Sequence, residues 1–392
     1  MMTRFRLPPA SMFPLVFLAL FLVFASAPAR ADYTTRPEVT AFIEEIAARN
    51  KLDTAPLYVA LSRAIYNQRV IDLIQPPPKR GVRSWRRYRS RFLDRLHVEA
   101  GLEAWSQYEH TLAKAEKQYG VPAEIILGIL GVETIYGRNT GTFETLSALT
   151  TLAFDYPPRQ KLFRAELEAL FLLAHEQKRD PASYTGSFAG ALGWPQFLPS
   201  SVRAYAVDFD GDGKIDFDSD AADAIGSIAN YLRAFGWVPG ALVAERARLE
   251  PGVNPAPLLE LGFEPQLTPV QVLESGVRPL SGNMPPGDAT LIDLDSPGSA
   301  TEYWLGYRNF YAITRYNHSN FYAMAVFQLA QALRDGHDNP DAARSYATPE
   351  RKSARKSAKA SKTKKAKAGK AAKSSKKAKS KAPAKSAKQR KR

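Results

Sequence analysis

The sequence of 392 residues contains no cysteine and only five histidines. The lack of cysteine excludes a disulfide framework, a thiolate metal site and the lipid-attachment cysteine of a bacterial lipoprotein. The histidines form no HExxH or other metal-binding spacing, and neither a GxSxG elbow nor a P-loop occurs. These absences argue against a zinc enzyme, a serine-nucleophile hydrolase and a nucleotide-dependent enzyme.

Long hydrophobic runs are scarce, and the most apolar one lies near the N-terminus. Arg4 and Arg6 precede an apolar stretch from about Met12 to Phe24, and small residues follow up to Ala31. The run is short for a membrane span, so we predict that residues 1–31 are a signal peptide cut before Asp32. An uncleaved anchor helix is the alternative. The cleaved protein is expected to be soluble outside the cytoplasm, with no transmembrane span.

Acidic and aromatic residues are absent from residues 351–392, which hold 20 Lys plus Arg. Without these charges and the three arginines of the leader, the net charge of +15 becomes −8 for residues 32–350. We predict that residues 347–392 are disordered, because a segment of Lys, Ala and Ser cannot bury enough apolar surface. Such a tail suits contact with polyanions, and it equally suits a solvated segment without a partner.

The remaining residues, 32–346, show the hydrophobic periodicity of a mainly helical protein with a sizeable core. Between about 239 and 300 the pattern changes to prolines and short apolar runs such as ATLIDLD, which predicts a small strand-rich insertion. Helices are expected within residues 36–52, 83–120 as one long amphipathic run, 122–137, 159–177, 220–237 and 319–336.

Glu133 is a carboxylate within the apolar stretch GILGVETIYG. On a helix that starts near Pro122, Ile126, Ile129 and Glu133 fall on one face, so the side chain emerges from an apolar stripe. Desolvation would raise its pKa, as a general acid at a glycosidic oxygen requires. The alternative is an ordinary glutamate at a helix end, exposed or paired with Arg138.

Two further stretches could form a ligand surface. GSFAGALGWPQFLPSS, residues 186–201, brings Ser187 and Gln196 into a glycine-rich segment that cannot be helical throughout. FYAITRYNHSNFYAMA, residues 310–325, holds Tyr316, Asn317 and Tyr322, whose rings and amide suit sugars. A tight interhelical connection and ordinary core packing explain the same two patterns.

The stretch DFDGDGKIDFDSD, residues 208–220, has the spacing of a calcium-binding loop. Ser219 stands at position twelve, where an EF-hand has a bidentate glutamate. Either Asp220 closes a loop with one extra residue, or the affinity is poor; an acidic surface loop is the other interpretation. The predicted calcium ligands are Asp208, Asp210, Asp212, the backbone carbonyl of Lys214, and Asp220.

Several segments together resemble the lytic murein transglycosylase B family, also known as glycoside hydrolase family 103, in the same order along the chain. They are residues 120–137, 186–216, 223–237 and 309–330, within a similarity that runs from about Arg36 to Leu333. The resemblance implies a lysozyme-like helical fold with a calcium loop, a strand-rich insertion and a structural calcium ion. It also implies a monomeric, soluble periplasmic enzyme.

The activity implied by the resemblance is cleavage of the β-1,4 bond between N-acetylmuramic acid and N-acetylglucosamine in peptidoglycan glycan strands. The product is a 1,6-anhydro sugar formed without water, and the family's single catalytic acid falls on Glu133. A peptidoglycan hydrolase and a non-catalytic wall-binding protein remain the alternatives.

The resemblance also assigns substrate-binding positions, of which Ser187 and Asn317 would position the acetamido group or Glu133. The sequence departs from some relatives at Pro158, where they have a second arginine, and at Leu162, where they have a tyrosine. The implied substrate-binding residues are Tyr88, Arg159, Ser187, Gln196, Tyr231, Tyr316, Asn317 and Tyr322.

Overall fold

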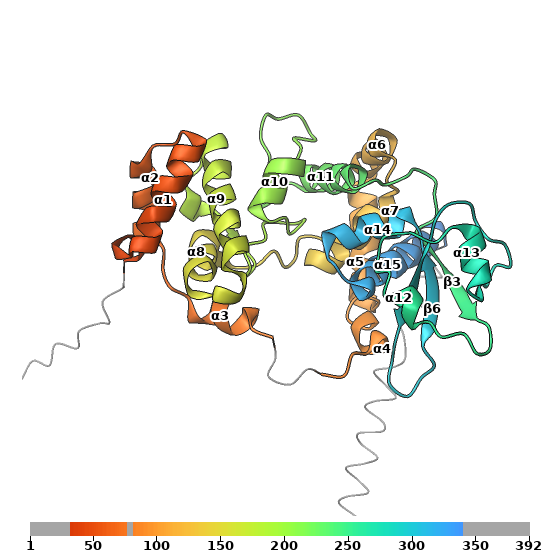
Figure 1. The fold of residues 1–392 in the computed structure, drawn as a ribbon. Helices are drawn as coiled ribbons and strands as arrows, with labels where there is room; N and C mark the ends of the chain where they lie inside the picture. The colour runs from red at the N-terminus through yellow and green to blue at the C-terminus, as the bar shows by residue number, and fades with distance from the viewer. Residues whose placement is uncertain (1–31, 77–80, 340–392) are drawn as a thin grey trace, which may run out of the picture.

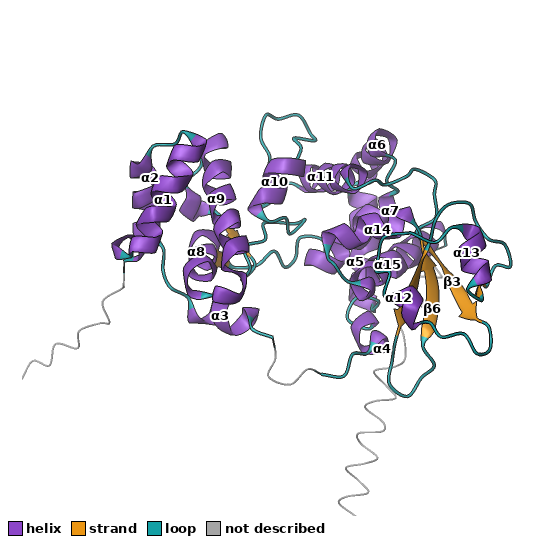
Figure 2. Ribbon diagram, in the orientation of Figure 1, coloured by secondary structure: helices purple, strands orange, loops and turns teal. Residues whose placement is uncertain are grey.

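The computed structural model describes residues 32–76 and 81–339. The predicted signal peptide and basic tail lie outside these residues. Helices dominate, and a small antiparallel sheet lies at one end of the molecule, which confirms the mainly helical prediction (Figure 2). Within the described ranges, no helix combines the length and the apolar character that a membrane crossing requires.

The first lobe is formed by residues 32–76 and 143–184, at the left of Figure 1. Tyr33 donates a 2.6 Å hydrogen bond to Asp155, and Arg36 pairs with Asp155 at 2.8 Å, so the N-terminal segment is fixed to a helix far along the chain. The helices of this lobe are α1 (Pro37–Asn50), α2 (Thr54–Arg63), α3 (Gln68–Ile74), α8 (Thr145–Asp155) and α9 (Gln160–Glu176).

The second lobe contains residues 81–137 and 221–339, and α10 (Pro199–Tyr205) packs between α9 of the first lobe and α11 of the second (Figure 1). Its helices are α4 (Trp85–Arg89), α5 (Arg95–Gln107), α6 (Glu109–Tyr119), α7 (Ala123–Thr134), α11 (Ala221–Ala234), α14 (Arg308–Tyr316) and α15 (Asn320–Asp338). Three-residue 3-10 helices lie at Tyr33–Thr35, Pro157–Arg159 and Pro181–Ser183.

The expectation of one long helical run over residues 83–120 was wrong, because the structure divides it into α4, α5 and α6. Asp94 caps α5 by accepting a 3.0 Å hydrogen bond from the backbone N–H of His97. Tyr108, with a non-helical backbone, separates α5 from α6. Gly120 ends α6 with φ +71°, as its position in the sequence predicted.

The strand-rich insertion is a four-stranded antiparallel sheet in the order β4-β3-β6-β5. It extends past the predicted boundary at residue 300, because β6 pairs with both β3 and β5 and completes the sheet. A separate two-stranded ladder joins β1 (Phe143–Glu144) to β2 (Thr185–Gly186). The other elements are β3 (Ala244–Leu249), β4 (Val277–Pro279), β5 (Thr290–Leu294), β6 (Glu302–Gly306), α12 (Ala256–Leu259) and α13 (Pro269–Glu274).

Helix α7 forms the centre of the second lobe and packs closely against α15. Gly128 allows this approach, because a Cβ at that position would lie 2.7 Å from the Val326 carbonyl oxygen and 3.3 Å from the Ala330 Cβ. Most side chains of α7 are buried on all sides of the helix, whereas Glu124, Val132 and Glu133 are partly exposed. The helix is therefore a core element that carries few polar groups.

We expect Gly128→Ala to lower the free energy of unfolding by about 1–3 kcal/mol, because α7 and α15 must separate to admit the methyl group. Thermal or urea unfolding would measure this loss. Gly81→Ala is the control, since no atom of the described residues lies within 4 Å of a Cβ built at Gly81. Equal stability of the two variants would contradict the close-packing argument.

Candidate active site

Glu133 lies in the last turn of α7, where the backbone leaves the helix abruptly. The predicted helix to Gly137 is wrong, because α7 ends at Thr134 and the next three residues, 135–137, have φ of +54°, +56° and +80°. Tyr136 turns inward and donates a 3.0 Å hydrogen bond to the His97 carbonyl. Gly137 has no room for a side chain, since a Cβ would lie 2.2 Å from the Trp194 ring.

The Glu133 carboxyl has one defined partner, the buried hydroxyl of Tyr322, which donates a 2.6 Å hydrogen bond to Oε1. The alternative pairing with Arg138 is not formed, because Arg138 binds Glu103 at 2.9 Å. Glu133 is half-buried, so protein encloses most of its side chain. This combination suits a group that exchanges a proton with a bound molecule.

Burial raises the pKa of Glu133 from 4.5 to about 7, and the hydrogen bond from Tyr322 opposes only part of that rise. In the described part of the chain, no neighbouring carboxylate contributes to the shift. Burial also raises the pKa values of the Tyr322, Tyr316 and Tyr88 hydroxyls, and the charge of Glu133 raises them further. All three hydroxyls therefore stay protonated beside a carboxyl that is poised near neutrality.

A cluster of aromatic rings continues from Tyr322. Tyr316 stacks on Tyr322 with a centroid distance of 6.4 Å, and it meets Tyr231 edge-on at 5.0 Å. The Tyr316 hydroxyl donates to the Pro195 carbonyl of the glycine-rich segment, and the Tyr231 hydroxyl donates to the Arg315 carbonyl at 2.7 Å. The rings thus fix α14, α15 and the glycine-rich segment relative to one another.

The glycine-rich segment, residues 186–197, is held by its own polar side chains. The side-chain nitrogen of Gln196 donates to the carbonyls of Thr140 and Gly193 at 2.9 and 2.8 Å, and Gln196 itself has φ +50°. The Ser187 hydroxyl accepts a 3.1 Å hydrogen bond from the backbone N–H of Ala191. The sequence predicted that residues 186–201 are not helical throughout, and α10 begins only at Pro199. Before it, Gly186 belongs to β2, and short bridges join Gly186 to Leu192 and Leu192 to Phe197.

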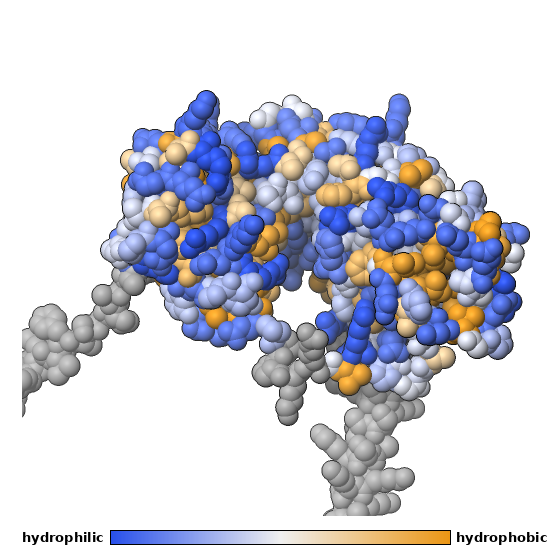
Figure 3. Space-filling model, in the orientation of Figure 1, coloured by the Kyte–Doolittle hydropathy of each residue, from blue (hydrophilic) through white to orange (hydrophobic). Residues whose placement is uncertain are grey.

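Two of the predicted site residues, Arg159 and Asn317, are exposed. Arg159 belongs to the first lobe, where its exposed guanidinium lies 5.3 Å from the Phe163 ring centroid. Asn317 caps the end of α14 and is exposed. The structure therefore gathers Tyr88, Tyr316 and Tyr322 around Glu133 and leaves Arg159 and Asn317 at the surface. Figure 3 shows a hollow between the two lobes.

Sequence reasoning did not single out Thr134, which joins the end of α7 to the glycine-rich segment. Its hydroxyl donates a 3.0 Å hydrogen bond to the Trp194 carbonyl and accepts a 3.0 Å hydrogen bond from the Gly137 N–H. The signal available in the sequence was a threonine within the apolar run GILGVET, directly after Glu133.

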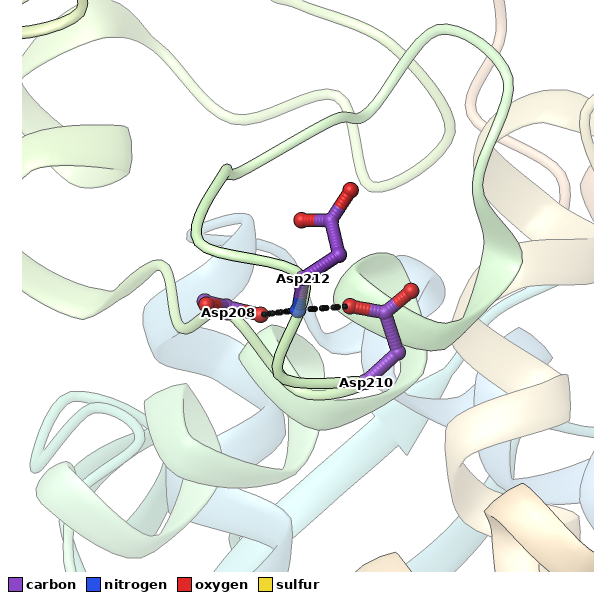
Figure 4. Close-up of side chains that lie close together, drawn as sticks. All are labelled: Asp208, Asp210 and Asp212. Carbon is purple, nitrogen blue, oxygen red and sulfur yellow. Dashed lines mark hydrogen bonds between the residues drawn. The ribbon is translucent and has the colours of Figure 1, made fainter.

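In the acidic loop between α10 and α11, backbone N–H groups donate hydrogen bonds to the loop's own carboxylates. Asp208 and Asp210 both accept hydrogen bonds from the backbone N–H of Asp212, at 3.1 and 3.0 Å (Figure 4). One carboxylate oxygen from each of Asp208, Asp210 and Asp212 lies within 4.8 Å of the others. These three aspartates are the ones that the spacing predicts as ligands in the first half of a calcium loop.

A second acidic group includes a residue that sequence analysis did not single out. Oxygens of Asp210, Asp220 and Asp223 lie within 4.8 Å of one another, and Asp223 is buried. Ser219 instead binds Asp216 at 2.6 Å, so Asp220 and not Ser219 is brought toward the loop. Burial raises the pKa values of Asp220 and Asp223, and neighbouring carboxylates add to this. Crowded carboxylate oxygens fit a hard divalent cation such as calcium.

The chain is similar to proteins of known activity. It is 43% identical over 310 residues to the membrane-bound lytic murein transglycosylase B of Escherichia coli strain K12, covering 77% of this chain and 84% of that protein. The Escherichia coli lytic transglycosylase Slt35 in complex with calcium has a TM-score of 0.70 and 42% identity, covering 79% of this chain and 96% of that one. SltB3 from Pseudomonas aeruginosa in complex with NAG-anhNAM-pentapeptide has a TM-score of 0.67 and 30% identity, and the match covers 76% of this chain and 79% of that one.

These likenesses confirm the lysozyme-like fold and define the class of the protein, a lytic transglycosylase. A model of the transglycosylase SLT domain matches residues 34–331, which is most of the chain. The chain therefore belongs to that family.

We expect Glu133→Gln to raise the melting temperature at pH 8 and to change it little at pH 4. A folded-state pKa raised from 4.5 to about 7 means that wild-type stability is full below 4.5 and is lost as the pH rises through 7. The neutral amide avoids that loss and still accepts the Tyr322 hydrogen bond. Thermal unfolding between pH 4 and pH 8 measures the difference in melting temperature between the wild type and Glu133→Gln.

The control for this measurement is Glu124→Gln on the same helix. Glu124 pairs with Arg334 at 2.5 Å, so its loss should not raise the melting temperature at any pH. A pH-independent gap for Glu133→Gln would contradict the raised pKa.

Proposed function

We propose that Glu133 is the single acid and base with which this enzyme cleaves the β-1,4 bond between N-acetylmuramic acid and N-acetylglucosamine. The observation that carries the proposal is the half-buried Glu133, whose carboxyl has a pKa near 7 and a buried tyrosine as its partner. At neutral pH a substantial fraction of the enzyme holds a proton at this position. Murein is the polymer in the name of the Escherichia coli relative, and an anhydro sugar is bound in the SltB3 complex.

The reaction needs one proton to travel out of Glu133 and one to return. Glu133 protonates the glycosidic oxygen, the bond from C1 of the muramoyl sugar to that oxygen breaks, and the substrate's acetamido group stabilises the cation. The C6 hydroxyl oxygen then bonds to C1 and gives its proton to the Glu133 carboxylate. The enzyme is restored, water is not consumed, and a second carboxylate is not required.

The Tyr322 hydroxyl orients the carboxyl in both steps. It donates to Oε1 and stays protonated, so it can hold the carboxyl when neutral and stabilise it when charged. Because it stacks on Tyr322, Tyr316 keeps that hydroxyl in place. A carboxyl held in a fixed direction can therefore protonate a substrate oxygen in the same geometry at each turnover.

We propose that the glycan strand lies in the hollow between the lobes. Tyr316 and Tyr322 border the reacting sugar, whereas Arg159, on the opposite lobe, is placed to meet an anionic part of the substrate. Stacking between rings and sugars accounts for the concentration of tyrosine. The proposed substrate-binding residues are Tyr88, Arg159, Ser187, Gln196, Tyr231, Tyr316, Asn317 and Tyr322.

We propose that residues 208–223 bind a calcium ion with a structural role, as the calcium complex of Slt35 suggests. A divalent cation would neutralise the crowded carboxylates and fix the connection between α10 and α11. The proposed ligands are Asp208, Asp210, Asp212, the backbone carbonyl of Lys214, Asp220 and the newly found Asp223.

The cellular context completes the proposal. A signal peptide at residues 1–31 would direct a monomeric, soluble enzyme to the periplasm, where its polymer lies. The basic segment at residues 347–392 would raise its local concentration on polyanions of the cell envelope.

Mass spectrometry of purified peptidoglycan digested with the mature protein tests the reaction. We expect anhydro-muropeptides, one water lighter than hydrolytic products, and a loss of at least about 100-fold in Glu133→Gln, because a positioned general acid contributes that much. Glu124→Gln should retain activity. Reducing-end products would establish a hydrolase, and undiminished cleavage by Glu133→Gln would remove Glu133 from the mechanism.

Calcium should raise the melting temperature of the mature protein by mass action, by the equivalent of about 2.7 kcal/mol at 100 times the dissociation constant. Asp210→Asn should abolish most of this shift, because Asp210 belongs to both acidic groups. Asp218→Asn, in the same loop and outside those groups, should preserve it. If neither calcium nor a chelator changed the melting temperature, the result would contradict calcium binding by this loop.

A further inference from the structure

A polar cleft of about 540 Å³ lies on the second lobe between α4, α15 and the sheet. Its walls include the side chains of Arg86 and Arg89 from α4, Arg246 from β3, and Gln328 from α15. Trp85 and Trp304 also line it, and both are buried. A cleft of this size can enclose several residues of a peptide.

The wall formed by α4 is attached through its backbone N–H groups to the two residues that directly follow β5. The N–H of Trp85 donates to the Asp295 carbonyl at 2.7 Å, and the N–H of Arg86 donates to the hydroxyl of the buried Ser296 at 2.9 Å. Figure 1 shows α4 beside the sheet. The arginine side chains therefore extend from a helix whose position is set by its neighbour.

Positive charge dominates the cleft. Among the described residues that line it are three guanidinium groups and one acidic side chain, Glu302. Arg246 forms an ion pair with Glu302 at 3.7 Å, and the Nε of Arg89 donates a 2.6 Å hydrogen bond to the uncharged side chain of Gln328. This surplus of positive charge in the cleft contrasts with the net charge of −8 for residues 32–350. Arginine forks on a rigid wall are suited to carboxylates.

Helix α4 also connects this cleft with the catalytic centre. Tyr88 lies between Arg87 and Arg89 in this five-residue helix, and the charge of Glu133 helps to raise the pKa of its hydroxyl. Tyr88 packs on Phe321 at 5.7 Å, next to Tyr322 in the chain. One short helix thus borders both the carboxyl that cuts the glycan and the cleft that carries the arginines.

We propose that this cleft binds the carboxylates of an acidic stem peptide of peptidoglycan, a binding site separate from the hollow that receives the glycan. The identity of the peptide rests on the proposed function. The guanidinium groups of Arg86, Arg89 and Arg246 pair with the peptide carboxylates. Gln328 and the serine hydroxyls form hydrogen bonds with the amide groups of the peptide. The enzyme thereby prefers strands that carry uncleaved stems.

The direct test is a binding titration of the mature protein with stem peptides released from peptidoglycan by an amidase, followed by tryptophan fluorescence and calorimetry. We expect Arg86→Gln combined with Arg89→Gln, and separately Arg246→Gln, to weaken binding by about tenfold or more, because each removes a charge-assisted hydrogen bond. Arg87→Gln is the matched control, since Arg87 lies on the same helix and does not line the cleft.

The ligand series identifies what the cleft recognises. The same peptides with amidated carboxylates should not bind, and inorganic phosphate at equal concentration should not compete. If phosphate bound to the cleft as strongly as the stem peptide does, the stem-peptide assignment would be overturned in favour of a general anion site. Equal binding by wild type and both cleft variants would overturn the site itself. Arg246→Gln, on the opposite wall, keeps the test valid if the α4 variant folds poorly.

Cleavage assays separate this inference from the proposed function. The cleft variants should cut glycan strands stripped of stems at the wild-type rate and lose about tenfold in kcat/KM on stem-bearing strands. Glu133→Gln should lose cleavage and bind the free peptide with unchanged affinity. Absence of cleavage by the wild type would contradict the proposed function alone, and equal kcat/KM of wild type and variants on both substrates would contradict the cleft.

Discussion

The hydrogen bond between Tyr322 and Glu133 joins two helices that the rest of the second lobe holds together. Glu133 lies in the last turn of a helix that is buried on nearly every side, so its carboxyl loses most of its water and its pKa rises to about 7. Tyr322 lies on α15, one turn before Val326, whose carbonyl approaches Gly128 of α7. The absence of a side chain at Gly128 therefore sets how close the tyrosine comes to the carboxyl.

The environment of Glu133 depends on segments that are far apart in the chain. The left-handed run at residues 135–137 turns the chain out of α7, and Thr134 and Gly137 contact Trp194 of the glycine-rich segment. Through Tyr316, that segment is in turn connected to α14 and α15. The acidic loop fixes the entry to α11, which packs on α6, α7 and α14. These local turns together determine the geometry of the segments around Glu133.

Periodicity was sufficient to predict the long helices, since α9 and α15 follow the expected apolar spacing closely. It was insufficient where one residue decides the backbone, as at Asp94, Tyr108 and the end of α7, because capping and positive φ leave almost no trace in an amphipathic pattern. Strands of two residues, such as β1 and β2, are too short to show alternation. Glu133 was identifiable from its apolar surroundings and the resemblance, whereas the buried Asp223 required the fold, because only the turn into α11 brings it to Asp210.

The central claim is that burial keeps a proton on Glu133 near neutral pH. The most direct measurement is a carbon-13 NMR titration of the glutamate carboxyls in the mature protein, with the Glu133 signal assigned by its loss in Glu133→Gln. The account predicts a midpoint near 7 for this carboxyl. A midpoint near 4.5, the ordinary value for glutamate, would show that the site does not hold the proton and would contradict a one-carboxyl mechanism.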